Sequence, residues 1–115
     1  MEPIPKHSIR VLDVDGLKVY VYVERFDNAL LIVVSKQGFK LGTLIFSMKE
    51  LEGPSRSTVL LGWRGGVQAR AFAEKVSSET GLMTLLSINL EEEYIQKQFR
   101  SILEALNQCI KEVAV

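Results

Sequence analysis

The sequence predicts an α+β domain with a six-stranded, mainly antiparallel sheet and the element order βββββαβα. We expect both helices on one face of this sheet and a second sheet packed against the other face in a dimer. Apolar residues alternate with period two through the first half of the chain, and the period lengthens to about 3.6 in two later stretches. With 115 residues, 47% of them apolar, the chain is long enough for one core.

Four stretches of the first half have strand patterning. They are residues 8–14, 17–26, 29–35 and 40–48. Asp15-Gly16 separates the first two and is typical of a two-residue hairpin. Asp27-Asn28 and Gln37-Gly38 mark the following turns. Connections this short predict an antiparallel meander.

The second half combines two helices with two further strands. Residues 49–57 form a loop with Gly and Pro, and residues 58–61 form a short fifth strand. A helix from Val67 ends at Gly81, a typical C′ glycine, and its apolar stripe is Ala69, Phe72, Ala73, Val76 and Thr80. Residues 83–90 are the sixth strand. The longest helix starts at Glu91 with the stripe Ile95, Phe99, Ile102, Leu103, Leu106, Ile110 and Val113.

Residues 1–7, which include two prolines, are expected to be a flexible lead-in, and residues 8–115 a single domain. Neither an internal repeat nor a second domain is indicated by the pattern.

Both faces of the predicted sheet are apolar. Valines alternate with Tyr20 and Tyr22 in the second strand, and the third strand is apolar at six consecutive positions. A sheet with one solvated face instead shows polar residues at alternate positions. We assign the partner-facing side of the sheet to Tyr20, Tyr22, Val33 and Ile45, which leaves Leu44 and Phe46 on the opposite side.

Two helices cover one face, so roughly five to eight large side chains would stay exposed on the other. Burying each contributes about 1.5–3 kcal/mol, a sum that rivals the stability of a whole domain. An identical or related sheet packed face to face in a two-fold dimer is the expected cover. The alternative is a sheet that curls into a closed barrel.

Composition excludes several partners. The 14 basic and 14 acidic residues balance, which argues against nucleic acid. The longest apolar run, residues 29–34, is too short to span a membrane, and the first residues do not resemble a signal peptide. The single cysteine fits a reducing compartment, so we expect a cytoplasmic protein.

The sequence contains few candidate catalytic residues. His7 is the only histidine and Cys109 the only cysteine, too few for a zinc site of usual spacing. Neither has an adjacent acid or base in the sequence, so a nucleophilic triad is unsupported. We interpret Cys109 as a residue that packs the last helix against the rest of the domain. We expect no enzyme activity, no metal and no cofactor.

Two segments are candidates for binding another protein. Trp63 and Arg64 lie in the glycine-rich turn of residues 62–66, and both residue types are enriched at interface hot spots. This turn lacks the spacing of known phosphate loops, although anion binding stays an alternative. The loop of residues 49–57 contributes Lys49, Glu52 and Arg56, and is either a linker or a segment that orders on a partner.

Several short motifs occur in a familiar order. LLIVVSKQGFKLGTL at residues 30–44 combines an apolar strand, a Q-x-G-type turn and a glycine followed by Thr-Leu; the matching residues are Gln37, Gly38, Gly42, Thr43 and Leu44. VLLG at residues 59–62 and the helix RAFAEKVSSETG follow. With the strand LLSINL and the last helix, these motifs resemble the third and fourth proteasome assembly chaperones over roughly residues 8–113.

This resemblance implies a small chaperone that pairs through its sheet and holds α-subunits of the 20S proteasome while their ring forms. It leaves open a homodimer or one half of a heterodimer, and it assigns no residue to the client surface. Two alternatives remain: another dimeric scaffold, of trafficking or signalling type, and a small anion- or nucleotide-binding domain.

Overall fold

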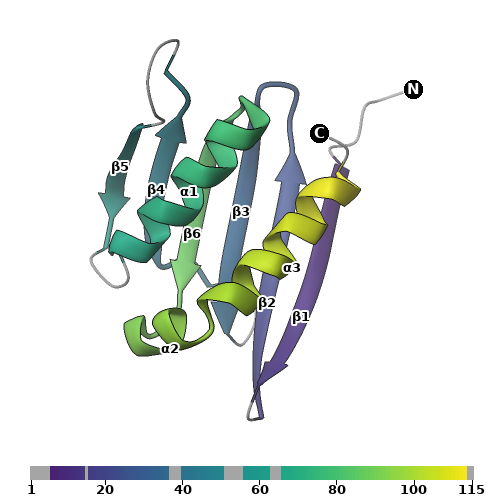
Figure 1. Cartoon of the computed structure of the whole chain (residues 1–115), viewed down its shortest axis with the longest axis vertical. Coiled ribbons are helices and arrows are strands. Elements are labelled where there is room, and N and C mark those ends of the chain that lie inside the picture. Colours follow the sequence, from purple (N-terminus) through teal and green to yellow (C-terminus); the bar gives the residue numbers. More distant parts are fainter. Residues whose placement is uncertain (1–5, 15, 37–39, 51–55, 63–65, 114–115) are drawn as a thin grey trace.

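The fold is a six-stranded sheet with helices on one face only (Figure 1). The computed structural model describes residues 6–14, 16–36, 40–50, 56–62 and 66–113. Its strands are β1 (Lys6–Val14), β2 (Leu17–Arg25), β3 (Ala29–Lys36), β4 (Thr43–Met48), β5 (Arg56–Leu61) and β6 (Met83–Asn89). Its helices are α1 (Gly66–Thr80), α2 (Glu92–Lys97) and α3 (Phe99–Glu112). The predicted α+β class and the helices on one face are confirmed.

The predicted four-strand meander is wrong after β3. The strand order is β1-β2-β3-β6-β4-β5, so β6 lies between β3 and β4, parallel to β3 and antiparallel to β4. The predicted Gln37-Gly38 turn lies outside the described residues, but the strands on either side of it, β3 and β4, do not pair with each other. A short connection predicts that two strands are neighbours in the sheet only when no later strand inserts between them.

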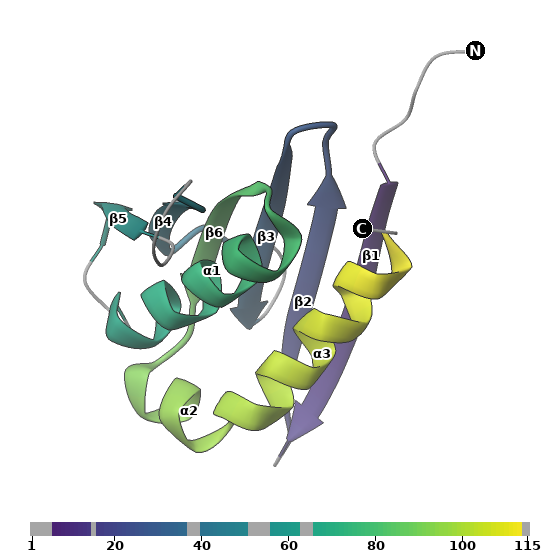
Figure 2. The ribbon, with the colours of Figure 1, turned by 45° about the horizontal axis from the view of Figure 1, so that its top comes forward.

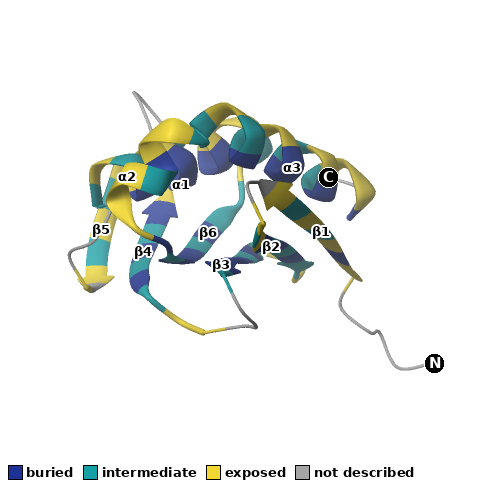
Figure 3. Ribbon diagram, turned by 90° about the horizontal axis from the view of Figure 1, so that it is seen from below, coloured by how far each residue is buried: buried dark blue, intermediate teal, exposed yellow. Residues whose placement is uncertain are grey.

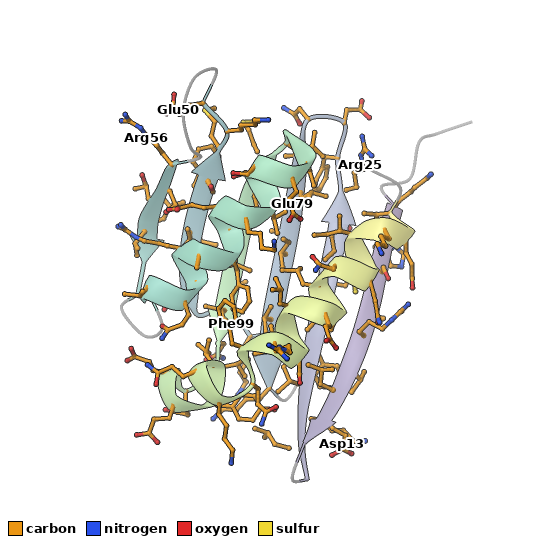
Figure 4. All side chains as sticks on the ribbon, in the orientation of Figure 1. Asp13, Arg25, Glu50, Arg56, Glu79 and Phe99 are labelled. Atoms are coloured by element: carbon orange, nitrogen blue, oxygen red, sulfur yellow. The ribbon has the colours of Figure 1, made fainter. Side chains whose placement is uncertain are left out.

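The face of the sheet beneath the helices holds the core. One cross-strand row runs from Val23 through Ile32, Leu86 and Ile45 to Val59. The helix α1 lies over β4, β5 and β6, whereas α3 lies over β1 and β2 (Figures 1 and 2). The rings of Phe72 on α1 and Phe99 on α3 stack with centroids 4.4 Å apart and join the two helices. Figure 4 labels Phe99 at the start of α3.

The last helix is divided in two, which the sequence did not predict. Gln98 has φ −107° and ψ 19°, outside the helical region, and it ends α2 and starts α3. This break changes the direction of the chain, so that Ile95 on α2 and Ile102 on α3 are both fully buried. In Figure 2 the short helix α2 lies to the left of the start of α3.

Two further expectations have clear outcomes. The closed barrel is wrong, because β1 and β5 stand at opposite ends of the strand order and do not pair with each other. The hairpin predicted at Asp15-Gly16 is confirmed by the pairing of Val14 with Leu17 and by the φ of +79° at Gly16, while Asp15 itself lies outside the described residues. The start of β1 lies at Lys6, so only residues 1–5 of the predicted lead-in fall outside the description.

Gly42 explains how β4 reaches its place beside β6. A Cβ built there would lie 2.3 Å from the main-chain oxygen of Ile88 and 2.8 Å from Asn89 Cα. The Gly42 N–H donates to Ser87 Oγ at 3.0 Å. The chain therefore crosses the end of β6 at a distance that only glycine permits.

Two glycine substitutions should distinguish the energetic cost of a steric clash from the cost of a strained backbone conformation. Gly42→Ala forces its methyl group into the backbone of β6 and should lower the free energy of unfolding by about 3 kcal/mol. Gly16→Ala meets no atom within 4 Å and bears only the cost of its positive φ, about 1 kcal/mol. Urea denaturation measures both values. Equal losses, or a tolerated Gly42→Ala, would contradict the crossing described here.

Candidate functional site

The candidate site is the open face, defined as the side of the sheet opposite α1 and α3. Figure 3 shows the molecule as two layers, with the helices above the sheet and no element of the described chain below it. The large apolar side chains of the open face belong to Ile9, Val11, Tyr20, Tyr22, Leu31, Val33, Leu44, Phe46, Met48 and Leu85. The face is therefore apolar on the five neighbouring strands β1, β2, β3, β6 and β4.

Cross-strand register aligns these side chains in rows. One row runs through Leu31, Leu85 and Phe46, and the next runs through Ile9, Tyr22, Val33 and Leu44 with Ser87 between the last two. Ser87 is fully buried and accepts the hydrogen bond from Gly42. The Ser87 hydroxyl in this row is thus already engaged in a hydrogen bond.

Charged residues lie at the margins of the open face. Asp13 pairs in register with Lys18 at one end of β1 and β2, and His7 pairs with Glu24 at the other end. Arg56 stands at the start of the edge strand β5. An apolar centre with a polar rim is the usual anatomy of a protein–protein interface.

A small polar cluster occupies the His7 corner. The Tyr22 hydroxyl donates to Glu24 Oε1 at 2.9 Å, and the rings of His7 and Tyr22 stack with centroids 6.0 Å apart. Burial, together with the hydrogen bond and the negative charge of Glu24, raises the pKa of Tyr22. Tyr22 therefore stays a neutral donor and is well suited to an interface.

Of the four residues predicted to face a partner, three lie on the open face. Tyr20 and Tyr22 are half-buried there, and Val33 is 7% exposed. The placement of Ile45 is wrong: it pairs with Leu86 in the core row and is fully buried under the helices. Leu44 and Phe46 take the open-face positions of β4 instead. Alternation separates two sets of residues but does not say which set meets the helices.

Of the five predicted client-binding residues, the structure describes only Lys49 and Arg56. Lys49 follows β4 and Arg56 begins β5 at the same end of the sheet, where Arg56 Nε lies 3.5 Å from Glu50 Oε1 (Figure 4). Glu52, Trp63 and Arg64 lie outside the described residues.

The glycine turn after β5 has a packing explanation at Gly62. This residue has φ +85°, and a Cβ there would lie 2.9 Å from both Cα and Oγ1 of Thr43. Gly62 thus brings the end of β5 against the start of β4 before α1 begins. This contact accounts for the glycine without a bound anion.

Cys109 lacks the surroundings of a catalytic nucleophile. Cys109 is fully buried, and its Sγ lies 3.7 Å from the main-chain oxygen of Val21. Burial raises the pKa of the Cys109 thiol, although Ser8 and Arg10 act in the opposite direction. The predicted packing role of Cys109 is confirmed. Within the described ranges, no three His, Cys, Asp or Glu side chains come together as metal ligands.

None of the described helices is long and apolar enough to cross a membrane.

One solved structure shares this fold over nearly its whole length. The match is a chain of the "Crystal Structure of a Novel Chaperone Complex for Yeast 20S Proteasome Assembly", with a TM-score of 0.77, 13% sequence identity, and coverage of 96% of this chain and 98% of that chain. Neither a family model nor a curated protein matches the sequence. The fold that the sequence resemblance implied is thereby confirmed.

The environment of Cys109 leads to a prediction about thiol reactivity. Because the thiol is buried and its pKa is raised, the folded protein at neutral pH should react with a disulfide reagent at least about 100-fold more slowly than the unfolded chain. Absorbance of the released thiolate, with and without denaturant, measures both rates. Similar rates in the two states would contradict the packing of Cys109.

Proposed function

We propose that this protein is a non-catalytic assembly chaperone, which dimerises through its open face and binds α-subunits of the 20S proteasome to promote ring assembly. The open apolar face is the observation that carries the proposal. Its partner is a second copy of the chain, in the default two-fold arrangement.

The energetics of the open face support a sheet-to-sheet dimer. Ile9 is 40% exposed and Val11 51%, and these two residues lie at the β1 margin of a broad apolar centre. Large contiguous apolar surfaces are rare on monomers. Each large side chain that a partner covers contributes about 1.5–3 kcal/mol before the costs of association are subtracted. A second sheet about 10 Å away would cover the whole face.

The shared fold supports the chaperone role. A chain from a complex that assembles the yeast 20S proteasome has the same fold from end to end, and the motifs at residues 30–44 and 59–62 point to the same group of proteins. The proposal accordingly includes a cytoplasmic location and excludes an enzyme, a cofactor, nucleic acid and membranes as parts of the function.

A charge placed on the open face should break the dimer. Phe46→Glu puts a carboxylate at the centre of the face and should weaken dimerisation at least about 100-fold. Val11→Glu provides a second variant whose position is already half exposed in one copy, so that folding is preserved. Val67→Glu, 78% exposed at the start of α1, is the matched control. Sedimentation equilibrium gives the mass of each variant.

The expected masses are twice 12.9 kDa for the wild type and Val67→Glu, and about 12.9 kDa for the two open-face variants at low micromolar concentration. A wild type of 12.9 kDa, or open-face variants that stay dimeric, would refute the sheet-to-sheet dimer.

Binding to α-subunits tests the chaperone role itself. Purified dimer is mixed with recombinant α-subunits from the same organism, with β-subunits as the control, and the mixtures are run on native gels. We expect a shifted complex with at least one α-subunit and none with β-subunits alone. If no α-subunit or α-ring is shifted on the gel by the dimer, the proposed chaperone role is refuted.

A further inference from the structure

Two serines interrupt the apolar pattern of the open face. Ser35 on β3 lies in register with Tyr20 on β2. Ser87 on β6 lies in register with Val33 and Leu44 on its two neighbouring strands. Both serines are fully buried in a single copy of the chain. Because a buried hydroxyl group is costly unless it forms a hydrogen bond, the partner of each serine shows what covers it.

The partners of both serines belong to the crossing segment, which we define as residues 40–42. The Gly42 N–H donates to Ser87 Oγ at 3.0 Å, and the Lys40 N–H donates to Ser35 Oγ in a longer bond of 3.4 Å. The crossing segment therefore lies on the open-face side of β3 and β6. Figure 3 shows it between β3 and β4, on the side of the sheet away from the helices.

The crossing segment rests directly on the end of β6. A Cβ at Gly42 would lie 2.8 Å from Asn89 Cβ, and Asn89 is in register with Ser35 at this end of the open face. No space is left between the segment and the strand beneath it. The segment therefore adds a second layer of main chain over one end of the open face.

Leu41 is the apolar side chain that the crossing segment presents. It is 69% exposed, whereas Val11, the most exposed apolar residue of the open face itself, is 51% exposed. The hydrogen bonds of Lys40 and Gly42 hold the main chain on both sides of Leu41. Little backbone freedom therefore remains to be lost when a partner covers this side chain.

A second sheet on the open face would meet the crossing segment. Packed sheets lie about 10 Å apart, and the segment occupies part of the layer between them. A scattered leucine on a protein surface needs no explanation, but Leu41 continues a broad apolar face on the same side of the sheet. The partner that covers the face is therefore the one that reaches Leu41.

We propose that Leu41 anchors the dimer by packing against the second copy, so that the crossing segment extends the sheet-to-sheet contact. This inference rests on the proposed function, because the second copy is the partner assigned to the open face there. In a two-fold arrangement the contact is reciprocal, and each dimer contains it twice. A client bound on the helix side of the sheet would not reach Leu41.

The reactivity of an introduced thiol tests whether a second copy covers this position. Leu41→Cys is made in the wild type and in the Val11→Glu background, which the open-face proposal expects to be monomeric, and the reaction with a disulfide reagent is followed. Cys109 is buried and contributes little to the signal. Val67→Cys in the same two backgrounds is the control, since Val67 is 78% exposed on the helix side.

We expect the Leu41→Cys thiol to react at least about tenfold more slowly in the dimer than in the Val11→Glu background, and the Val67→Cys thiol to react at rates within about twofold of each other. Leu41→Ala should weaken dimerisation at least about tenfold in sedimentation equilibrium, because each dimer loses two covered leucine side chains. Val67→Ala should leave dimerisation within about twofold of the wild type. Both alanine variants change residues that are exposed in one copy, so folding is preserved.

The alternative results are distinct. A dimer in which the Leu41→Cys thiol reacts as fast as in the Val11→Glu background, or undiminished dimerisation by Leu41→Ala, overturns this inference and leaves the sheet-to-sheet dimer standing. A monomeric wild type overturns the proposed dimer together with this inference. Protection of the Leu41→Cys thiol that arises only when recombinant α-subunit is added places the client on the open face and overturns the second copy as its occupant.

Discussion

The rest of the structure depends on one constraint: the sheet is apolar on both faces, and the described helices cover only one of them. The helices α1 and α3, joined by the stacked rings of Phe72 and Phe99, close the core over Val23, Ile32, Leu86 and Ile45. No described helix covers the opposite rows, through Tyr22, Val33, Leu85 and Phe46. Burial of apolar surface holds the helices on one face, and within the proposal the same force joins two copies through the other face.

The strand order gives the sheet its breadth. Placing β6 between β3 and β4 extends the apolar centre across neighbouring strands, and the close crossing at Gly42 makes this order sterically accessible. Each edge strand is joined to a helix through a glutamate: Arg10 of β1 forms an ion pair with Glu112 of α3, and Ser57 Oγ of β5 donates to Glu74 of α1.

Sequence patterning predicted the elements much better than their arrangement. Alternation at residues 17–23 and the glycines at positions 16 and 81 determine local structure, because each acts over a few residues. The insertion of β6 between β3 and β4 depends on long-range strand pairing, which no local sequence pattern encodes. Gly42, which no predicted turn explains, was the one available signal of this strand order. Ile45 was assigned to the wrong face for a related reason. The alternation of side chains along a strand is a local property, whereas the position of α1 depends on the whole fold. The division of the last helix at Gln98 could not be predicted, because no helix-breaking residue stands at that point of the sequence.

Small-angle X-ray scattering tests the central claim most directly, because one copy is a slab of 38 × 36 × 22 Å with a Cα radius of gyration of 13.4 Å. Two slabs packed through their open faces should have twice the 12.9 kDa mass and about twice the shortest dimension, which makes a nearly isotropic particle. A 12.9 kDa particle with a radius of gyration close to 13.4 Å, or a dimer extended along the plane of the sheet, would contradict the account.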